Sequence, residues 1–359
     1  MSPVTSSPSE ALREPSRPGP DGRAGTKRLE RLLETSQEVL FDQPRQGLEQ
    51  ARRALETIDR EARRLAEPSR SELAARAALG LANALRVVGD LPQAEAAFER
   101  ARGRIDEVPD ALLRRRLDAR RYDLLASLYN DQRRFPEAVA SIDRALALYR
   151  RLGDERRQAR AWINKGHVLE TAGARNQSLR AFRQALARLD PHHEPRQFAI
   201  CMHNLLRGLH RAGYTIAALS LLGDVRALYE ALGDETPRLR LLWLEAEMLL
   251  EIGREAVAES LFEEVRAGFV ELDMPYDAAL VSLDLAALYL EQNRAYKLRD
   301  LALRLFPVFQ SHKVHREAMA ALILYREALA THALDLDLIA RLGEYLQKAP
   351  GSPELAFRY

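Results

Sequence analysis

The sequence has very little cysteine and no long apolar run, and these shortages restrict the classes of protein to which it can belong. Cys201 is the only cysteine among 359 residues, so an intramolecular disulfide is excluded and a reducing compartment is expected. No segment approaches the ~18 consecutive apolar residues that cross a bilayer. The most apolar stretch, 239–252, contains four charged residues. The N-terminus also lacks the apolar core of a secretory signal, so we expect a cytoplasmic protein without a membrane partner.

The motifs of catalysis and cofactor binding are also missing. There is no glycine-rich phosphate loop and no Gly-x-Ser-x-Gly elbow. Cys201 stands among apolar residues of an expected helix, which is typical of an inert buried thiol. His203 and His210 are separated by a rise of about 10.5 Å along a helix, which is too far for one metal ion. We therefore expect no enzymatic activity, no metal and no cofactor.

Lysine is scarce although arginine is abundant. Lysine occurs at only five positions among 54 basic residues, and the formal net charge is +2. Such a nearly neutral chain has no overall field that would draw it onto nucleic acid, and we interpret the arginine bias as the mark of a GC-rich genome. A nucleic-acid partner is therefore the least favoured of the alternatives considered.

The chain divides into three parts by composition. Residues 1–26 contain five prolines among serines and glycines and have no apolar period, so this segment is expected to be disordered. From residue 27 to 348, apolar residues recur at the i, i+3, i+4 and i+7 spacing of amphipathic helices, which are separated by glycine and proline breakers. Residues 349–359 form a short C-terminal tail. The folded part is predicted to be all-α.

The dominant internal pattern is a repeat of forty residues. The segment 149–155 returns 80 residues later at 229–235, with its Tyr, Leu, Gly, Asp and Glu in place. Gly173, Gly213 and Gly253 follow the same step of 40. Self-similarity at such a period is typical of a stacked repeat array, in which each unit packs against its neighbours and the surface holds other molecules.

Each repeat is predicted to be a pair of helices with small residues at fixed places. In the fourth repeat, Trp162 and Gly166 stand on the first helix, whereas Ser178, Phe182 and Ala185 stand on the second. The small residues allow the helices to approach closely, and the bulky Phe fills the space that they leave.

These residues resemble the tetratricopeptide repeat pattern, Trp-x2-Leu-Gly-x2-Tyr followed by Ala-x3-Phe-x2-Ala. The resemblance covers about residues 30–330 and is strongest in the second to fourth repeats. It implies a right-handed superhelical solenoid of stacked antiparallel helix pairs, about seven of them, with a capping pair at 315–331 and 335–348. Long-period arrays of this kind are similar to those of bacterial regulatory and signalling proteins.

The resemblance also implies where a ligand would bind, because the first helices of such an array line a concave groove. Family members that clamp an extended peptide use asparagine amides for its backbone and basic side chains for its carboxylates. By register, the candidate peptide-binding residues are Arg120, Arg160, Asn164, His167, His203, Asn204, Arg207, Arg240 and Trp243. Solvated positions in an arginine-rich chain are the alternative interpretation. Apolar residues such as Leu283, Met319 and Ile323 extend the groove towards the C-terminus, where they either seat an apolar anchor or close the superhelix.

The sequence therefore favours a non-enzymatic scaffold that binds a protein or peptide segment, including an acidic segment or one with a free carboxylate. The first alternative is a peptide-responsive sensor that regulates a bacterial signalling, transcription or defence effector when the ligand changes the superhelical pitch. The second is a nucleic-acid-binding helical array, which strongly salt-dependent binding would reveal.

Overall fold

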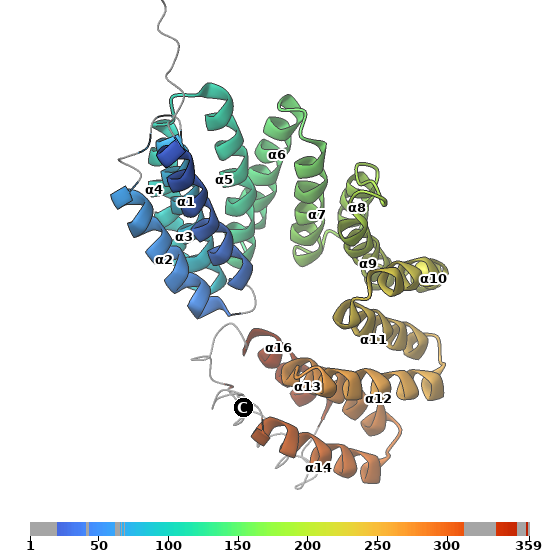
Figure 1. Ribbon diagram of the computed structural model, residues 1–359. Coiled ribbons are helices and arrows are strands. Elements are labelled where there is room, and N and C mark those ends of the chain that lie inside the picture. Colours follow the sequence, from blue (N-terminus) through green and yellow to red (C-terminus); the bar gives the residue numbers. More distant parts are fainter. Residues whose placement is uncertain are drawn as a thin grey trace, which may run out of the picture.

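The computed structural model describes residues 20–40, 43–61, 65, 67, 69–311, 335–349 and 357, and within these residues it contains helices and no strand (Figure 1). The helices stack in chain order into a curved solenoid, so the predicted all-α repeat fold is confirmed. They are α1 (Pro20–Val39), α2 (Pro44–Glu61), α3 (Ser69–Val87), α4 (Leu91–Asp106), α5 (Ala111–Asp131), α6 (Phe135–Arg151), α7 (Glu155–Thr171), α8 (Arg175–Leu186), α9 (Pro195–Arg211), α10 (Thr215–Leu232), α11 (Glu235–Glu251), α12 (Glu255–Glu271), α13 (Pro275–Glu291), α14 (Ala295–Ser311) and α16 (Leu336–Lys348). None of these helices is long and apolar enough to cross a membrane.

The forty-residue period is visible in the backbone as a repeated left-handed turn between the two helices of a pair. Gly173, Gly213 and Gly253 have φ angles of 77°, 82° and 77°, a region that only glycine enters without a steric cost. Arg133 and Asn293 occupy the same place in other pairs, with φ angles of 59° and 54°. The left-handed turn is therefore kept where glycine is absent, because the packing of the two flanking helices holds the backbone in this conformation despite its steric cost.

The close approach of α7 and α8 depends on Gly166. A Cβ atom at this position would lie 2.4 Å from Cε1 of Phe182, whose side chain is fully buried. The hydroxyl of Ser178 on α8 also donates a hydrogen bond of 2.8 Å to the carbonyl oxygen of Gly166. The predicted packing of a small residue against a bulky Phe is confirmed for this pair.

The buried apolar side chains form a series of local clusters, each built from consecutive helices. One cluster around Phe98 joins α3, α4 and α5, and another around Phe182 extends from α7 to α11. A third cluster around Phe262 joins α11, α12, α13, α14 and α16. Packing of each unit against its neighbours is what a repeat array requires.

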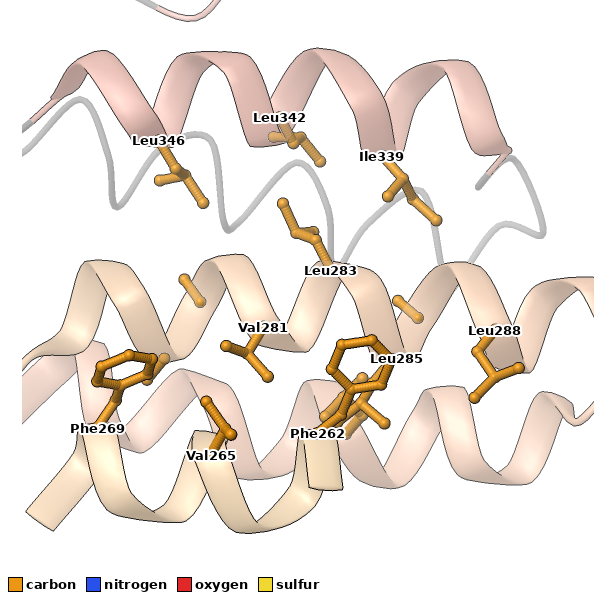
Figure 2. Close-up of a cluster of buried hydrophobic side chains, with 14 of the residues drawn as sticks. Phe262, Val265, Phe269, Val281, Leu283, Leu285, Leu288, Ile339, Leu342 and Leu346 are labelled. Atoms are coloured by element: carbon orange, nitrogen blue, oxygen red, sulfur yellow. The ribbon is translucent and has the colours of Figure 1, made fainter. Parts of the chain in front are cut away.

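At the C-terminal end, α16 covers one side of α13. Leu283 of α13 is 4% exposed and points towards Ile339, Leu342 and Leu346 of α16, whereas α12 packs on the opposite side of α13 (Figure 2). Leu283 lies in the same register as Trp243, one repeat earlier. The apolar part of the groove is thus covered at this position by the chain's own helix, which corresponds to closure of the superhelix.

The two ends of the chain refine the predicted boundaries. The helix α1 begins at Pro20, so the last part of the segment 1–26 is helical rather than disordered. Proline suits the first turn of a helix, and Leu29 and Leu33 anchor α1 in a buried cluster. The predicted helix at 335–348 is present as α16. Its expected partner at 315–331, with Met319 and Ile323, lies outside the described residues.

Candidate functional site

The concave side of the solenoid is lined by the first helix of each pair, and its N-terminal half contains a cavity of about 620 Å³. The cavity lies mainly among α1, α3, α5 and α7. Its polar lining residues are Ser36, Gln37, Glu72, Arg76, Asn83, Arg86, Arg116, Arg120, Asp123, Ser127, Arg157, Arg160 and Asn164. Three of the predicted ligand residues, Arg120, Arg160 and Asn164, therefore share one cavity.

The lining of this cavity carries an excess of positive charge, because six arginines face two carboxylates. The guanidinium of Arg76 lies 3.5 Å from Glu72, and that of Arg157 lies 3.4 Å from Asp154. Both Arg116 and Arg160 are exposed, and neither forms an ion pair with any residue that the structure describes. The cavity therefore has positive charge available for a ligand.

Asn164 is held by the preceding repeat. Its amide nitrogen lies 3.2 Å from the backbone oxygen of Asp123, 3.1 Å from Oδ1 of the same residue and 3.4 Å from the hydroxyl of Ser127. The other carboxylate oxygen of Asp123 accepts a hydrogen bond of 3.2 Å from Arg120. The contacts of Asn164 join α7 to α5, whereas the Arg120 bond lies within α5, and a ligand that takes the Asn164 amide or the Arg120 guanidinium must compete with Asp123.

Asn204 and His167 form a second link, between α9 and α7. The amide nitrogen of Asn204 lies 3.2 Å from Nε2 of His167. Burial, reinforced by the positive charge of Arg207, lowers the pKa of His167 to about 4, so its ring is neutral at pH 7 and can accept this hydrogen bond. Glu170 on α7 accepts hydrogen bonds from Arg207 at 3.3 Å and from Arg211 at 3.0 Å.

His203 and Arg240 belong to the next segment of the wall. Nδ1 of His203 is buried and has no hydrogen-bond partner among the described residues. Burial, with the positive charges of Arg207 and Arg240, lowers the pKa of His203 to about 4. The guanidinium of Arg240 donates a hydrogen bond of 3.3 Å to Asp277 and so connects α11 to α13. His203 is therefore a neutral ring beside two cationic side chains.

Trp243 is tied to α13. Its Nε1 donates a hydrogen bond of 2.6 Å to Asp284, and its ring packs edge-on against Phe269 with the centroids 6.1 Å apart. Burial raises the pKa of Asp284 to about 6 against the lowering effect of this hydrogen bond. Burial, assisted by the negative charge of Asp284, raises the pKa of Glu247 to about 7. The wall between α11 and α13 therefore has two carboxyl groups whose pKa values are raised by burial.

The remaining titratable groups provide no further site. Cys201 is buried in the α7–α11 cluster. Burial raises the pKa of its thiol to about 12, so the thiol stays protonated and unreactive at neutral pH. Within the described parts of the chain, no group of three or more histidine, cysteine, aspartate and glutamate side chains is placed to hold a metal ion.

The nine predicted residues all lie on the first helices, but they do not converge on one site. Three line the cavity, and five of the others form a series of contacts between repeats farther along the wall. His203 instead packs against Tyr229 of its own helix pair. Sequence reasoning missed Arg116, and it did not identify Asp123, Glu170 and Asp284 as acidic partners. A usable signal existed: the pairs that these acids form with Asn164, Arg207 and Trp243 are separated by 41, 37 and 41 residues, about one repeat.

Comparison with known proteins supports the repeat assignment. Residues 118–190, which include most of α5 and all of α6, α7 and α8, match the sequence profile of the tetratricopeptide repeat family. This segment contains tetratricopeptide repeats. The matched segment includes Gly166 and Phe182, whose packing is described above. A comparison of the sequence with curated proteins gives no match.

Solved structures share the fold of this solenoid at low sequence identity. A Rap protein complexed with Competence and Sporulation Factor is 14% identical, with a TM-score of 0.59, and the alignment covers 91% of this chain and 88% of that one. The Rap conjugation gene regulator of plasmid pLS20, in complex with the Phr* peptide, is 13% identical, with a TM-score of 0.50 and coverage of 88% and 97%. A signal transduction ATPase with a tetratricopeptide repeat sensor from Pyrococcus horikoshii is 13% identical, with a TM-score of 0.63; the alignment covers 92% of this chain and 47% of that one. At such low identities, the structural similarity shows a common fold and nothing more.

Proposed function

We propose that this chain is a non-catalytic, cytoplasmic protein of bacterial regulatory type that binds a peptide or protein segment on its concave face. The observation that carries the proposal is the polar cavity of about 620 Å³, because this volume lies within the usual range of ligand pockets. Two solenoids of the same fold were solved with a factor or a peptide bound, which supports the same use of the fold here. The single cysteine supports a reducing compartment.

The expected partner segment is acidic or has a free carboxylate. Arg116 and Arg160 contribute two positive charges without described ion-pair partners, and each planar guanidinium can form paired hydrogen bonds with a carboxylate. An excess of positive charge on the wall also speeds the encounter with a negatively charged ligand. Peptides enriched in Asp and Glu should therefore be preferred over basic or neutral ones.

The test is selection of a random displayed peptide library against the full chain, followed by affinity measurements on variants. The double variant Arg116→Glu with Arg160→Glu reverses the free charge of the cavity. We expect it to bind the selected acidic peptides at least about tenfold more weakly, the loss of about one charge-assisted contact. Arg115→Glu is the matched control, because Arg115 is an exposed neighbour on α5 that does not line the cavity. Equal binding to the parent and to the double variant would refute the groove assignment.

A sensor function is the second candidate, and the contacts of Asp123 favour it. A ligand that takes the Asn164 amide from Asp123 loosens the link between α5 and α7, and such a change alters the pitch of the solenoid. Small-angle scattering with and without a selected peptide distinguishes the two functions: a changed radius of gyration supports the sensor, and an unchanged one supports a rigid scaffold. Binding to DNA or RNA with a steep salt dependence would instead support a nucleic-acid-binding array.

A further inference from the structure

We propose that the arginine-lined cavity recognises a phosphoryl group carried by the bound segment, so that the ligand is a phosphorylated peptide. This inference rests on the proposed peptide-binding function and specifies the chemistry of one subsite. It is carried by three features of the cavity: the imbalance between donors and acceptors, the charge that its described neighbours leave unpaired, and the lengths of its internal ion pairs.

The polar lining offers many donors and few acceptors. Six guanidinium groups, each with five N–H donors, face only two carboxylates. A peptide backbone has donors and acceptors in equal number. Its N–H groups would therefore find too few acceptors in this cavity. A phosphoryl group has three strong acceptor oxygens, and as a monoester it has no donor when fully ionised. The lining therefore suits a group that only accepts hydrogen bonds.

The unpaired charge also fits a phosphoryl group better than a single carboxylate. Arg116 on α5 and Arg160 on α7 form no ion pair with described residues, and both line the cavity. Two positive charges are balanced by the ~−1.5 to −2 of a phosphate monoester, whereas one carboxylate supplies half of this charge. The planar guanidinium can also form two parallel hydrogen bonds with one phosphate group.

The other cavity arginines are held loosely enough to turn towards a ligand. The pairs Arg76–Glu72, Arg120–Asp123 and Arg157–Asp154 have N···O distances of 3.5, 3.2 and 3.4 Å. Arg76 also lies 3.8 Å from Glu30. A tight charge-assisted bond measures roughly 2.7–2.9 Å. Of the six, Arg86 has such a bond, at 2.7 Å with Asp131. Three guanidiniums can therefore exchange weak internal contacts for stronger ones to a phosphoryl group.

The probe is the acetylated and amidated pentapeptide Ala-Ala-phosphoserine-Ala-Ala, compared by calorimetry with its serine and glutamate counterparts on the full chain. We expect the phosphopeptide to bind at least about tenfold more tightly than the glutamate peptide, and the serine peptide to show no measurable binding. Inorganic phosphate is the second probe: weaker binding of phosphate than of the phosphopeptide supports a peptide ligand, and equal binding of the two overturns it. Equal binding of the phosphopeptide and the glutamate peptide would overturn the inference.

Three variants locate the binding. Arg116→Gln with Arg160→Gln should weaken phosphopeptide binding by at least about tenfold, whereas the control Arg115→Gln should leave it unchanged. Glu72→Gln removes a negative charge from the lining and leaves Arg76 with the longer pair to Glu30, at 3.8 Å, so it should tighten binding by up to about fivefold. Opposite signs for the arginine and glutamate variants would not arise from a general loss of folding. If the double variant binds the phosphopeptide as well as the parent does, the cavity is not the phosphoryl site.

The outcome also separates this inference from the proposed function. Library selection can yield unphosphorylated acidic peptides whose binding depends on Arg116 and Arg160, while the phosphoserine peptide binds no better than its glutamate counterpart. In that case the peptide-binding function stands and the phosphoryl subsite is refuted. If the phosphopeptide depends on these arginines and no unmodified peptide is selected, phosphorylation is obligatory for recognition.

Discussion

Replacement of Gly166 by alanine is the sharpest test of the helix packing that defines the repeat. The added Cβ would lie 2.4 Å from Cε1 and 2.7 Å from Cδ1 and Cζ of Phe182. Carbon atoms in favourable contact are roughly 3.5–4.0 Å apart, so three ring atoms would overlap with the new methyl group. The ring cannot move freely away from α7, because the α-carbon of Gly208 on α9 lies on its other side, where a Cβ would be 3.8 Å from Cε2.

The expected cost follows from two opposing effects. Overpacking of a filled core costs about 1–3 kcal/mol, and the overlap at three atoms places Gly166→Ala at the upper end. Alanine gains up to about 1 kcal/mol over glycine in a helix interior. The net destabilisation is therefore about 2 kcal/mol. Gly223→Ala in α10 is the matched control, because a Cβ there has no atom within 4 Å; it should stabilise the protein by up to about 1 kcal/mol.

The free energy of unfolding of both variants is measured by urea unfolding, followed by far-ultraviolet circular dichroism. Hydrogen exchange then shows whether the effect is localised to α7 and α8. The two alanine substitutions should shift stability in opposite directions. Phe182→Leu should also relieve Gly166→Ala, because leucine lacks the ring atoms that overlap, and the double variant should lose less stability than the sum of the single variants. If Gly166→Ala stabilises the protein as Gly223→Ala does, the close approach of α7 and α8 is wrong.

Three further predictions test the groove wall and the C-terminal helix. Asn204→Ala removes the amide beside Nε2 of His167 and should cost about 1 kcal/mol in thermal unfolding as well as weaken peptide binding; weaker binding with an unchanged melting temperature would show that the amide serves the ligand alone. Burial raises the pKa of Asp284 from its usual 3.8 to about 6, so this carboxyl stabilises the fold below about pH 4 and loses that contribution as the pH rises through 6. Asp284→Asn should therefore raise the melting temperature relative to the parent at pH 8 more than at pH 4, and equal shifts at both would contradict the burial of its charge. Leu342→Ala empties a fully buried position and should cost about 2–5 kcal/mol, seen as faster hydrogen exchange in α16 and α13; unchanged exchange would contradict the covering of Leu283.

The fold was accessible from the sequence because its signals are local. The pairing of Gly166 with Phe182 falls within one repeat, and the glycine turns recur at a fixed step. The structure adds that the turn persists at Arg133 and Asn293, which no glycine pattern could indicate. There the left-handed backbone is imposed by the flanking helices rather than by residue preference.

The wall of the groove was harder to predict, because each contact joins two different repeats. An asparagine in the middle of a helix needs a hydrogen-bonding reason, and this argument singled out Asn164 and Asn204. The sequence does not say whether the partner is a ligand or a neighbouring helix. The structure gives Asn164 a partner in Asp123 and places Asn204 beside His167. Residues one repeat apart on successive first helices approach each other, so the acidic partners could be found only after the forty-residue register had been fixed.

The distribution of these contacts makes the two ends of the concave face unequal. At the C-terminal end, Trp243 is hydrogen-bonded to Asp284, and Leu283 is covered by α16. These side chains are therefore engaged in contacts within the chain. At the N-terminal end, Arg116 and Arg160 line a cavity and have no described ion-pair partner. A ligand should therefore enter between α3 and α7 first. Under the proposed sensor function, displacement of Asn164 from Asp123 would loosen the junction between α5 and α7, and this junction is where binding and superhelical pitch would be coupled.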